Sequence, residues 1–356
     1  MATPQMKLMS RAPEIPDYVS PEVDPEGRAT IRLYHPMAGS VWCEGEWRDW
    51  APLEMRRDGD GLWSCTTEAL APDIYEYRIY ADGARVIDYQ NGRTKNRFTS
   101  FLEVSVAGKA AIFEAREVPH GTVHAHWYHS AVTGCARRMH VYTPPGYEAD
   151  AERAYPTLYL LHGAGDDDES WVRTGRLNFI LDNLAAEGRV APMVVAMPDG
   201  HVLGRNWKEH RGTKLRAFAA DFYEHIIPET ERLYRARRDR EGRAMAGLSM
   251  GGGQTISAGM TRPGMFGAYG IFSSGLWPEV TPLLEGALDE LRAKPPGVLW
   301  VGIGRRDFLF GHCVMLTRML AGAGVPVIYH EDDSVHSWRA WRDYLERFAP
   351  LLFREP

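Results

Sequence analysis

The stretch "GRAMAGLSMGGGQTIS", Gly242 to Ser257, places one serine among several glycines directly after an apolar run. Glycines gather where the backbone bends sharply or where neighbouring chain leaves no room for a Cβ. Within the stretch, Gly247-Leu248-Ser249-Met250-Gly251 fits G-x-S-x-G, a turn between a strand and a helix that lifts the serine hydroxyl clear of a sheet. A serine capping a helix is the alternative. We predict a strand, a sharp turn and a helix, with Ser249 as a nucleophile.

Further apolar runs flank this stretch in the C-terminal two thirds of the chain. They lie at Tyr155–Gly163, Ala191–Gly200, Gly267–Ser274, Gly297–Asp307 and Val325–Asp333, separated by segments long enough for helices. Continuous apolar strands that alternate with helices are typical of a parallel sheet covered on both faces. The fold class of this region is therefore predicted to be α/β.

The N-terminal region has a different pattern. From about Ala29 to Val106, short runs alternate between apolar and polar residues and are separated by Gly, Asp and Pro, as in a small β-sandwich. The expected organisation is an N-terminal extension over 1–28, a sandwich over 29–106, a linker over 107–118 and an α/β domain over 119–356.

Composition narrows the class of protein. The 356 residues are 44% hydrophobic and 25% charged with a net charge of -6, as in a soluble globular protein without a basic surface for nucleic acid. No apolar run approaches the roughly 18 residues of a membrane span. The first residues lack the apolar core of a secretory signal, so the chain as written is expected in the cytoplasm unless a signal has been removed. The oligomeric state stays open.

The four cysteines are scattered. Cys43, Cys65, Cys135 and Cys313 show no C-x-x-C spacing, which argues against zinc and thioredoxin-like chemistry. Buried free thiols are expected, and a bridge between Cys43 and Cys65 on neighbouring strands stays open.

A serine nucleophile needs a base, and the base needs a carboxylate that fixes its tautomer. In a parallel sheet such groups collect at the carboxyl ends of the strands. Asp307 closes the apolar run that begins at Gly297, and His336 follows the next run. Asp332 and Asp333 compete as the acid but lie on the loop of the histidine itself. We predict Ser249, Asp307 and His336 as the catalytic residues.

Two backbone N–H groups are expected to stabilise the oxyanion of the reaction. Met250 follows the nucleophile and supplies one donor. Ala164, in the loop after Tyr155–Gly163, is best placed for the second, although a plain glycine turn is the alternative. The acidic run Asp166–Glu169 is interpreted as a solvated face that caps a helix.

Four histidines, His120, His124, His126 and His129, invite a metal interpretation. Alternation along a strand would split them between two faces, and no acidic or cysteine partner is close in the sequence. We therefore expect neither a metal nor another cofactor.

A resemblance to a known family rests on eight motifs in order: "VPHG", "YTPPGY", "YPTLYLLHGAGDDDESW", "GRLNFILDNL", "MVVAMPDG", "GLSMGG", "GIGRRDF" and "HSWRAWRDYL". From about Val118 onwards the chain resembles the feruloyl and acetylxylan esterases of carbohydrate esterase family 1, related to esterase D and to enterochelin esterases. The resemblance implies an α/β-hydrolase in which Ser249, Asp307 and His336 form the triad, and Ala164 and Met250 the oxyanion hole.

The N-terminal region resembles a carbohydrate-binding module of family 48 through "VWCEGEWRDWAPLEMRRDGDGLWSCTTEALAPDIYEYRIYADGARVIDYQN". This implies an Ig-like β-sandwich. Its tryptophans, Trp42, Trp47, Trp50 and Trp63, are candidates for stacking on sugar rings, although aromatic side chains in a small sandwich more often form its core.

The implied function is a serine esterase that removes ferulate or acetate from plant cell-wall polysaccharide through an acyl-enzyme. The partner is then a small or polysaccharide ester, with Trp338, Arg205 and Trp207 as candidates for substrate binding. A siderophore trilactone esterase is the main alternative, in which Arg205, Lys208 and Arg211 would hold an anionic catecholate, although a solvated loop is the simpler interpretation of these three residues. A non-catalytic carbohydrate-binding protein is a further alternative, against which the complete set of catalytic residues argues.

Overall fold

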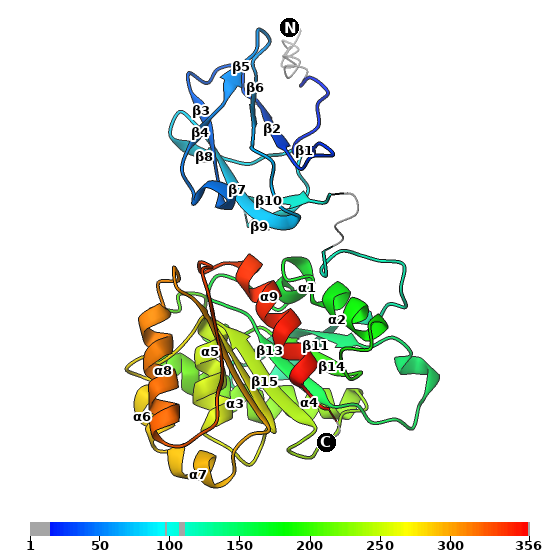
Figure 1. Ribbon diagram of the computed structural model, residues 1–356, viewed down its shortest axis with the longest axis vertical. Helices are drawn as coiled ribbons and strands as arrows, with labels where there is room; N and C mark the ends of the chain where they lie inside the picture. The colour runs from blue at the N-terminus through cyan, green and yellow to red at the C-terminus, as the bar shows by residue number, and fades with distance from the viewer. Residues whose placement is uncertain (1–14, 97, 107–110, 355–356) are drawn as a thin grey trace, which may run out of the picture. The chain divides into compact units, whose positions relative to one another are not determined.

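The computed structural model describes residues 15–96, 98–106 and 111–354 (Figure 1). Residues 1–14 of the expected extension and 107–110 of the expected linker lie outside the described residues. Contacts divide the chain into two units, 1–111 and 112–356. The second unit begins before the predicted start at residue 119, because the Asn183 side-chain amide donates to the carbonyls of Ile112 and Glu114.

The first unit consists of two antiparallel sheets. One has the order β1 (Glu22–Val23), β2 (Ala29–Tyr34), β6 (Leu62–Thr66) and β5 (Arg56–Arg57). The other has the order β4 (Leu53–Glu54), β3 (Val41–Gly45), β7 (Asp73–Ala81), β10 (Thr99–Val104) and β9 (Thr94–Asn96), with β8 (Ala84–Val86) paired to β7. A 3-10 turn spans Glu46–Arg48. Ile31 and Leu33 of one sheet and Tyr77 and Ile79 of the other share one core, so the two sheets form a sandwich.

The four tryptophans of this unit differ in burial. Trp63 is buried, and its indole N–H donates to the carbonyl of His35. The other three are half-buried. Trp42 stacks on Tyr80 with ring centroids 5.1 Å apart, Trp47 packs against the core, and the guanidinium of Arg78 lies over Trp50. One of the four therefore belongs wholly to the core.

All four cysteines are free. Cys43 on β3 and Cys65 on β6 are buried free thiols, as expected; they share one core but belong to different sheets rather than to neighbouring strands. Burial raises the pKa of the Cys43 thiol well above its ordinary value. Cys313 is buried as expected, whereas Cys135 is exposed because it begins the strand that follows a hairpin turn.

The second unit is built on one eight-stranded sheet. Its order is β11 (Thr122–Ser130), β12 (Cys135–Thr143), β14 (Val194–Pro198), β13 (Thr157–Leu161), β15 (Arg243–Leu248), β16 (Ala268–Phe272), β17 (Val298–Gly304) and β18 (Ile328–Asp332). The strands from β14 to β18 are parallel, as predicted. The sheet is nevertheless mixed, because the tight turn between β11 and β12 forces antiparallel pairing, and β12 also pairs antiparallel with β14.

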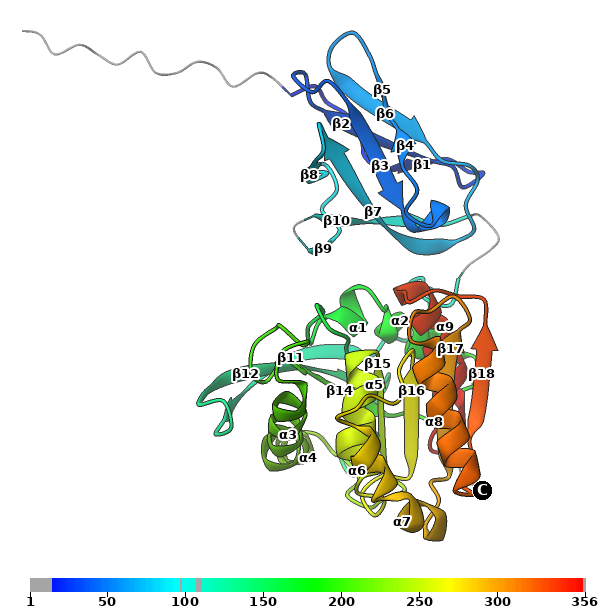
Figure 2. The ribbon, with the colours of Figure 1, turned by 90° about the vertical axis from the view of Figure 1, so that its left-hand side faces the viewer.

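Helices cover both faces of this sheet (Figure 2). They are α1 (Ser170–Arg173), α2 (Leu177–Ala186), α3 (Arg211–Asp221), α4 (Ile227–Leu233), α5 (Met250–Gln254), α6 (Thr281–Glu285), α7 (Leu288–Ala293), α8 (Phe310–Gly322) and α9 (Trp338–Phe348), with π-helical turns at Phe222–Ile226 and Thr255–Met260. The helices α2 and α9 lie together on one face, whereas α3, α5 and α8 pack on the other around Met245 and Tyr269. Among the described residues, no helix has the length and apolar character to cross a membrane.

Candidate active site

Ser249 occupies a sharp turn between β15 and α5. Its backbone has φ 51° and ψ −112°, a strained conformation for a residue with a Cβ. The Ser249 N–H donates to the carbonyl of Phe272 on β16, and its carbonyl accepts from the Gly253 N–H in the first turn of α5. A Cβ on Gly247 would lie 2.4 Å from the Gly251 backbone, so the turn requires glycine there. The strand, turn and helix thus occur as predicted.

Three side chains from separate loops form one chain of hydrogen bonds. His336 Nε2 lies 3.0 Å from Ser249 Oγ, and His336 Nδ1 lies 2.8 Å from Asp307 Oδ2. With hydrogen on Nδ1, the imidazole donates to Asp307 and accepts from the serine hydroxyl. Asp307 is only 4% exposed, and its other oxygen accepts from the Leu309 N–H. This arrangement can move the hydroxyl proton to Nε2 while a buried carboxylate holds the ring.

The two competing aspartates point elsewhere. Asp333 is an exposed residue that pairs with Arg305, 2.8 Å away. Asp332 accepts the backbone N–H of Ser334 and the hydroxyl of Tyr344. Of the three candidates, the carboxylate that contacts His336 is Asp307.

The two predicted oxyanion donors lie in loops on either side of Ser249. Met250 is buried and begins α5, next to the serine. A Cβ on Gly163 would lie 3.5 Å from the Ser249 Cβ, so the loop that carries Ala164 passes directly beside the serine. Ala164 itself is exposed, so its N–H belongs to a loop that substrate can reach.

His162 holds this loop, a role that the motif "LHGAG" gave no means to predict. Its Nδ1–H donates over 2.8 Å to the carbonyl of Gly163, which is the same peptide group that carries the Ala164 N–H. Its Nε2 accepts the Gly200 N–H at 2.8 Å and lies 3.2 Å from Asp199 Oδ1. His162 therefore fixes the orientation of the peptide that presents one predicted donor.

Asp199 and His162 influence each other's titration. Burial alone favours a neutral imidazole, but the hydrogen bond and the charge of Asp199 outweigh it, so the pKa of His162 lies above its ordinary value. Burial alone raises the pKa of Asp199, yet the contact with His162 lowers it far below its ordinary value. Once protonated, Nε2 donates to Asp199 and no longer accepts from Gly200.

A buried arginine anchors the loop after β14. Arg137 pairs with Asp221, and its guanidinium donates to the carbonyls of Asp199 and His201. Tyr128 completes the group, with its hydroxyl 2.9 Å from Asp221 Oδ2. This network fixes the residues that in turn hold His162.

The predicted substrate-binding residues differ in accessibility. Arg205 is exposed and donates to the carbonyl of Asp166, beside the loop that carries Ala164. Trp207 is 8% exposed and packs on Trp277. Trp338 is 1% exposed and packs on other indole rings, behind His336. Such burial argues against direct substrate contact by Trp338 and leaves Trp207 little free surface.

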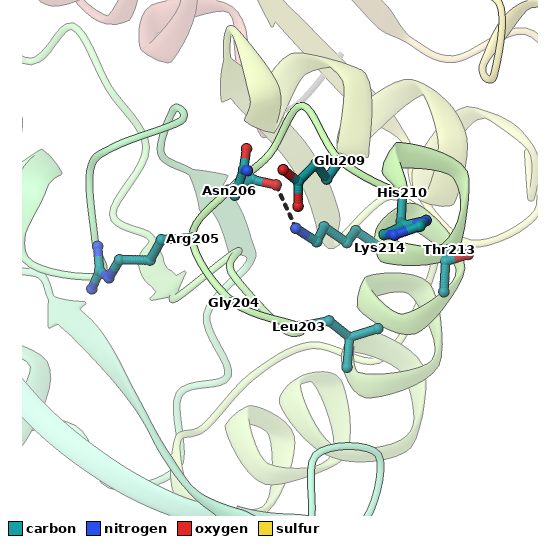
Figure 3. Close-up of a pocket in the computed structure, with 8 residues that line it drawn as sticks. All are labelled: Leu203, Gly204, Arg205, Asn206, Glu209, His210, Thr213 and Lys214. Carbon is teal, nitrogen blue, oxygen red and sulfur yellow. Dashed lines mark hydrogen bonds between the residues drawn. The ribbon is translucent and has the colours of Figure 1, made fainter.

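An open hollow of about 370 Å³ lies next to Arg205 (Figure 3). Figure 3 shows Lys214 reaching from α3 toward Asn206, whose carbonyl accepts from the ammonium group, with the Glu209 carboxylate close by. The remaining lining comes from Leu203, Gly204, His210 and Thr213. Its lining combines apolar surface with charged side chains of both signs.

The histidines of the N-terminal part of this unit are not arranged as a cluster. Acidic partners that are distant in the sequence contact two of them, Asp182 at His120 and Glu229 at His126. His124 instead contacts Thr143. Each of these three imidazoles thus has a separate partner. The expectation of a solvated face over Asp166–Glu169 is wrong for Asp166 and Asp168, which are buried, because Asp168 pairs with Arg138 and His140. Asp167 does cap the start of α1, where its carboxylate accepts from the Ser170 hydroxyl.

Comparisons with known proteins identify the family to which this chain belongs. The family described as "Putative esterase" matches residues 130–307. An endo-1,4-beta-xylanase/feruloyl esterase of Xylanibacter ruminicola is 30% identical over 94% of this chain and 46% of its own length, and esterase Rv1288 of Mycobacterium tuberculosis is 31% identical over 35% of this chain and 27% of its own length. The chain therefore spans less than half of the length of these curated relatives.

Solved structures share the fold. A ferulic acid esterase of family CE1 from Anaeromyces mucronatus is 26% identical, with a TM-score of 0.60 over 67% of this chain and 93% of that chain. The enterobactin esterase of Shigella flexneri has a TM-score of 0.63 over 91% of this chain and 92% of that chain, at 18% identity. These neighbours are esterases of the α/β-hydrolase type with a mixed sheet. Because the family match covers half of the chain, from the β11–β12 hairpin to Asp307, the chain belongs to this esterase family of carboxylic ester hydrolases.

Proposed function

We propose that this protein is a serine esterase in which Ser249 is the nucleophile, His336 the general base and acid, and Asp307 the carboxylate that orients it. The observation that carries the proposal is the hydrogen-bonded chain from Ser249 through His336 to Asp307, on a strained turn that exposes the hydroxyl. Each of the three residues lies at the carboxyl end of a strand.

Acylation begins when Ser249 Oγ attacks the ester carbonyl and its proton passes to His336 Nε2. The carbonyl oxygen becomes an oxyanion, which accepts hydrogen bonds from the N–H groups of Ala164 and Met250. Collapse of this intermediate breaks the bond to the alcohol, which leaves with the proton from Nε2. A water molecule, deprotonated by His336, then attacks the acyl-enzyme and releases the acid. Every proton is returned, so no further reactant is needed.

The substrate that we propose is a feruloyl or acetyl ester on plant cell-wall polysaccharide. Support comes from the name of the Xylanibacter ruminicola relative, a xylanase/feruloyl esterase, and from the ferulic acid esterase that shares the fold. The open hollow beside Arg205 offers charged and polar side chains to the hydroxyl groups of a glycan, next to apolar surface for its C–H groups.

A siderophore trilactone esterase is the second candidate, since the enterobactin esterase aligns with 91% of this chain. At 18% identity, this similarity shows a shared fold and does not show a shared substrate. Two of the cations proposed to hold a catecholate are already engaged, Arg205 by the carbonyl of Asp166 and Arg211 by Glu279. The second candidate is therefore less well supported.

A panel of four substrates tests the proposal: methyl ferulate, acetylated xylan, p-nitrophenyl acetate and ferric enterobactin. Hydrolysis of the first three, with acid release abolished in Ser249→Ala, is the expected result. Turnover of ferric enterobactin alone would replace the substrate class but keep the mechanism. Absence of hydrolysis with all four would contradict the enzymatic proposal.

For the first unit we propose an Ig-like, family 48 type carbohydrate-binding module, supported by its two antiparallel sheets and its half-buried tryptophans. Removal of residues 1–110 tests it, provided that the remaining chain shows cooperative unfolding. A larger loss of kcat/KM on feruloylated xylan than on p-nitrophenyl acetate is expected, because remote contacts hold a polymer near the serine. Equal losses on both esters would contradict a binding role.

A further inference from the structure

The imidazole of His336 contacts two aromatic rings that differ in exposure. One is Trp341, which is 4% exposed, with its ring centroid 5.0 Å away and its plane perpendicular to the imidazole. The other is Phe308, with its ring centroid 4.5 Å away. Phe308 is 73% exposed, the largest value among the large apolar side chains described in the second unit. A phenyl ring next to the catalytic imidazole thus presents most of its surface to solvent.

The backbone around Phe308 is held in place. Asp307 N–H donates to the Gly304 carbonyl, and the Asp307 carboxylate and carbonyl accept from Leu309 and Phe310. Phe308 is therefore part of the same short turn that positions the buried acid, directly before α8. An exposed apolar side chain on an ordered turn is available for contact with a ligand.

The chemistry of the proposed reaction specifies which part of the substrate comes to this ring. The leaving oxygen takes its proton from His336 Nε2, so it must come within about 3 Å of that atom. The alcohol that contains this oxygen then lies beside the imidazole of His336. An alcohol larger than methanol extends over the side chains next to that imidazole. Of the two rings that contact the imidazole, Trp341 is buried and Phe308 is the accessible one.

We propose that Phe308 is the platform for the alcohol part of the substrate, a sugar ring whose C–H groups pack on the exposed phenyl face. This inference rests on the proposed esterase function and adds a determinant of leaving-group specificity to it. Phe308 contacts substrate and transfers no proton, so its effect depends on the alcohol rather than on the acyl group.

The test uses two esters with the same acyl group, methyl ferulate and 5-O-feruloyl-arabinofuranose. Phe308→Ala should lower the ratio of kcat/KM for the sugar ester to that for the methyl ester by about fivefold to tenfold, the scale of one aromatic contact. Phe308→Tyr keeps the ring and should keep most of this ratio. Met315→Ala, which truncates a 56% exposed side chain on α8, is the matched control and should leave the ratio unchanged.

Thermal unfolding and circular dichroism of each variant show whether the turn is intact. An unchanged ratio in Phe308→Ala, or equal losses on both esters, would overturn the proposal. A ratio that changes only between p-nitrophenyl acetate and p-nitrophenyl ferulate would also overturn it, because Phe308 would then contact the acyl group. Failure of the wild type on every ester would instead refute the esterase function itself.

Discussion

Replacing His162 by phenylalanine tests how the loop beside Ser249 is held. Phenylalanine fills the same buried space without donating or accepting hydrogen bonds. The Gly200 N–H loses its acceptor, and the Gly163 carbonyl loses the stronger of two donors, keeping the Asp166 N–H at 3.2 Å. The peptide between Gly163 and Ala164 is then free to rotate, and the Ala164 N–H no longer points reliably at the oxyanion.

Two magnitudes follow from these contacts. A buried donor without an acceptor costs about 1–3 kcal/mol, and a lost hydrogen bond whose acceptor retains another partner costs about 1 kcal/mol, so the free energy of unfolding should fall by about 2–4 kcal/mol. Complete loss of an oxyanion donor lowers kcat by about 10²–10³. Because the Ala164 N–H is misoriented rather than removed, we expect kcat to fall by about tenfold to a hundredfold, with a smaller change in KM.

The assay combines hydrolysis of p-nitrophenyl acetate with urea unfolding of the same samples. His201→Phe is the matched control, since this buried imidazole lies 5.3 Å from that of His162 and its Nε2 has no hydrogen-bond partner among the described residues. Burial and the neighbouring His162 lower the pKa of His201 to about 4, so the control removes a neutral ring near pH 7. A kcat within twofold of wild type in His162→Phe, together with the expected loss of stability, would refute the positioning role. If this variant does not fold, His162→Gln keeps a donor and an acceptor and should retain more activity than His162→Leu.

Three further predictions concern the same site. Ser249→Ala should lower kcat by about 10³-fold or more without a large change in thermal stability, which activity near wild type would contradict. Asp307→Asn should reduce kcat severely whereas Asp333→Asn should not, and the opposite outcome in the same assay would reassign the acid. Asp199→Asn should reduce the melting temperature more at pH 5.5 than at pH 8.5. The pKa of His162 is raised in the folded state, so its charge interaction with Asp199 stabilises the protein at low pH and is lost as the pH rises through the folded-state pKa of His162. An equal reduction of the melting temperature at both pH values would exclude this charge interaction.

The parts of the site that sequence predicts are those determined by local pattern. A strand, a glycine-flanked serine and a helix can be read within one short stretch, and Asp307 and His336 follow other strands of the same parallel sheet. Since parallel strands end at one edge, their loops must converge. The sequence does not show which of the two carboxylates, Asp307 or Asp333, faces the histidine. In the structure Asp333 turns away to pair with Arg305.

Contacts between distant loops were beyond reach of the sequence. His162 binds the backbone of Gly200 across 38 residues, and nothing in "LHGAG" or "MPDG" indicates that the two meet. The antiparallel orientation of the β11–β12 hairpin in the sheet depends on its pairing with β14, which is distant in the sequence. The burial of Trp338 likewise depends on a distant residue, Trp171, whose ring packs on it. Sequence periodicity predicts which residues face the core, but it does not show which distant residue packs against each of them.

The glycines after Ser249 serve close packing as well as the turn. A Cβ on Gly251 would lie 2.6 Å from the carbonyl oxygen of His162, and one on Gly253 would lie 2.1 Å from the Trp277 ring. Helix α5 therefore packs closely against the end of β13 at Gly251 and against Trp277 at Gly253. Any larger residue would push α5 outward, and it would carry the Met250 N–H away from the peptide that His162 holds. The spacing between the two proposed oxyanion donors thus depends on the same glycine run that allows the strained turn at Ser249.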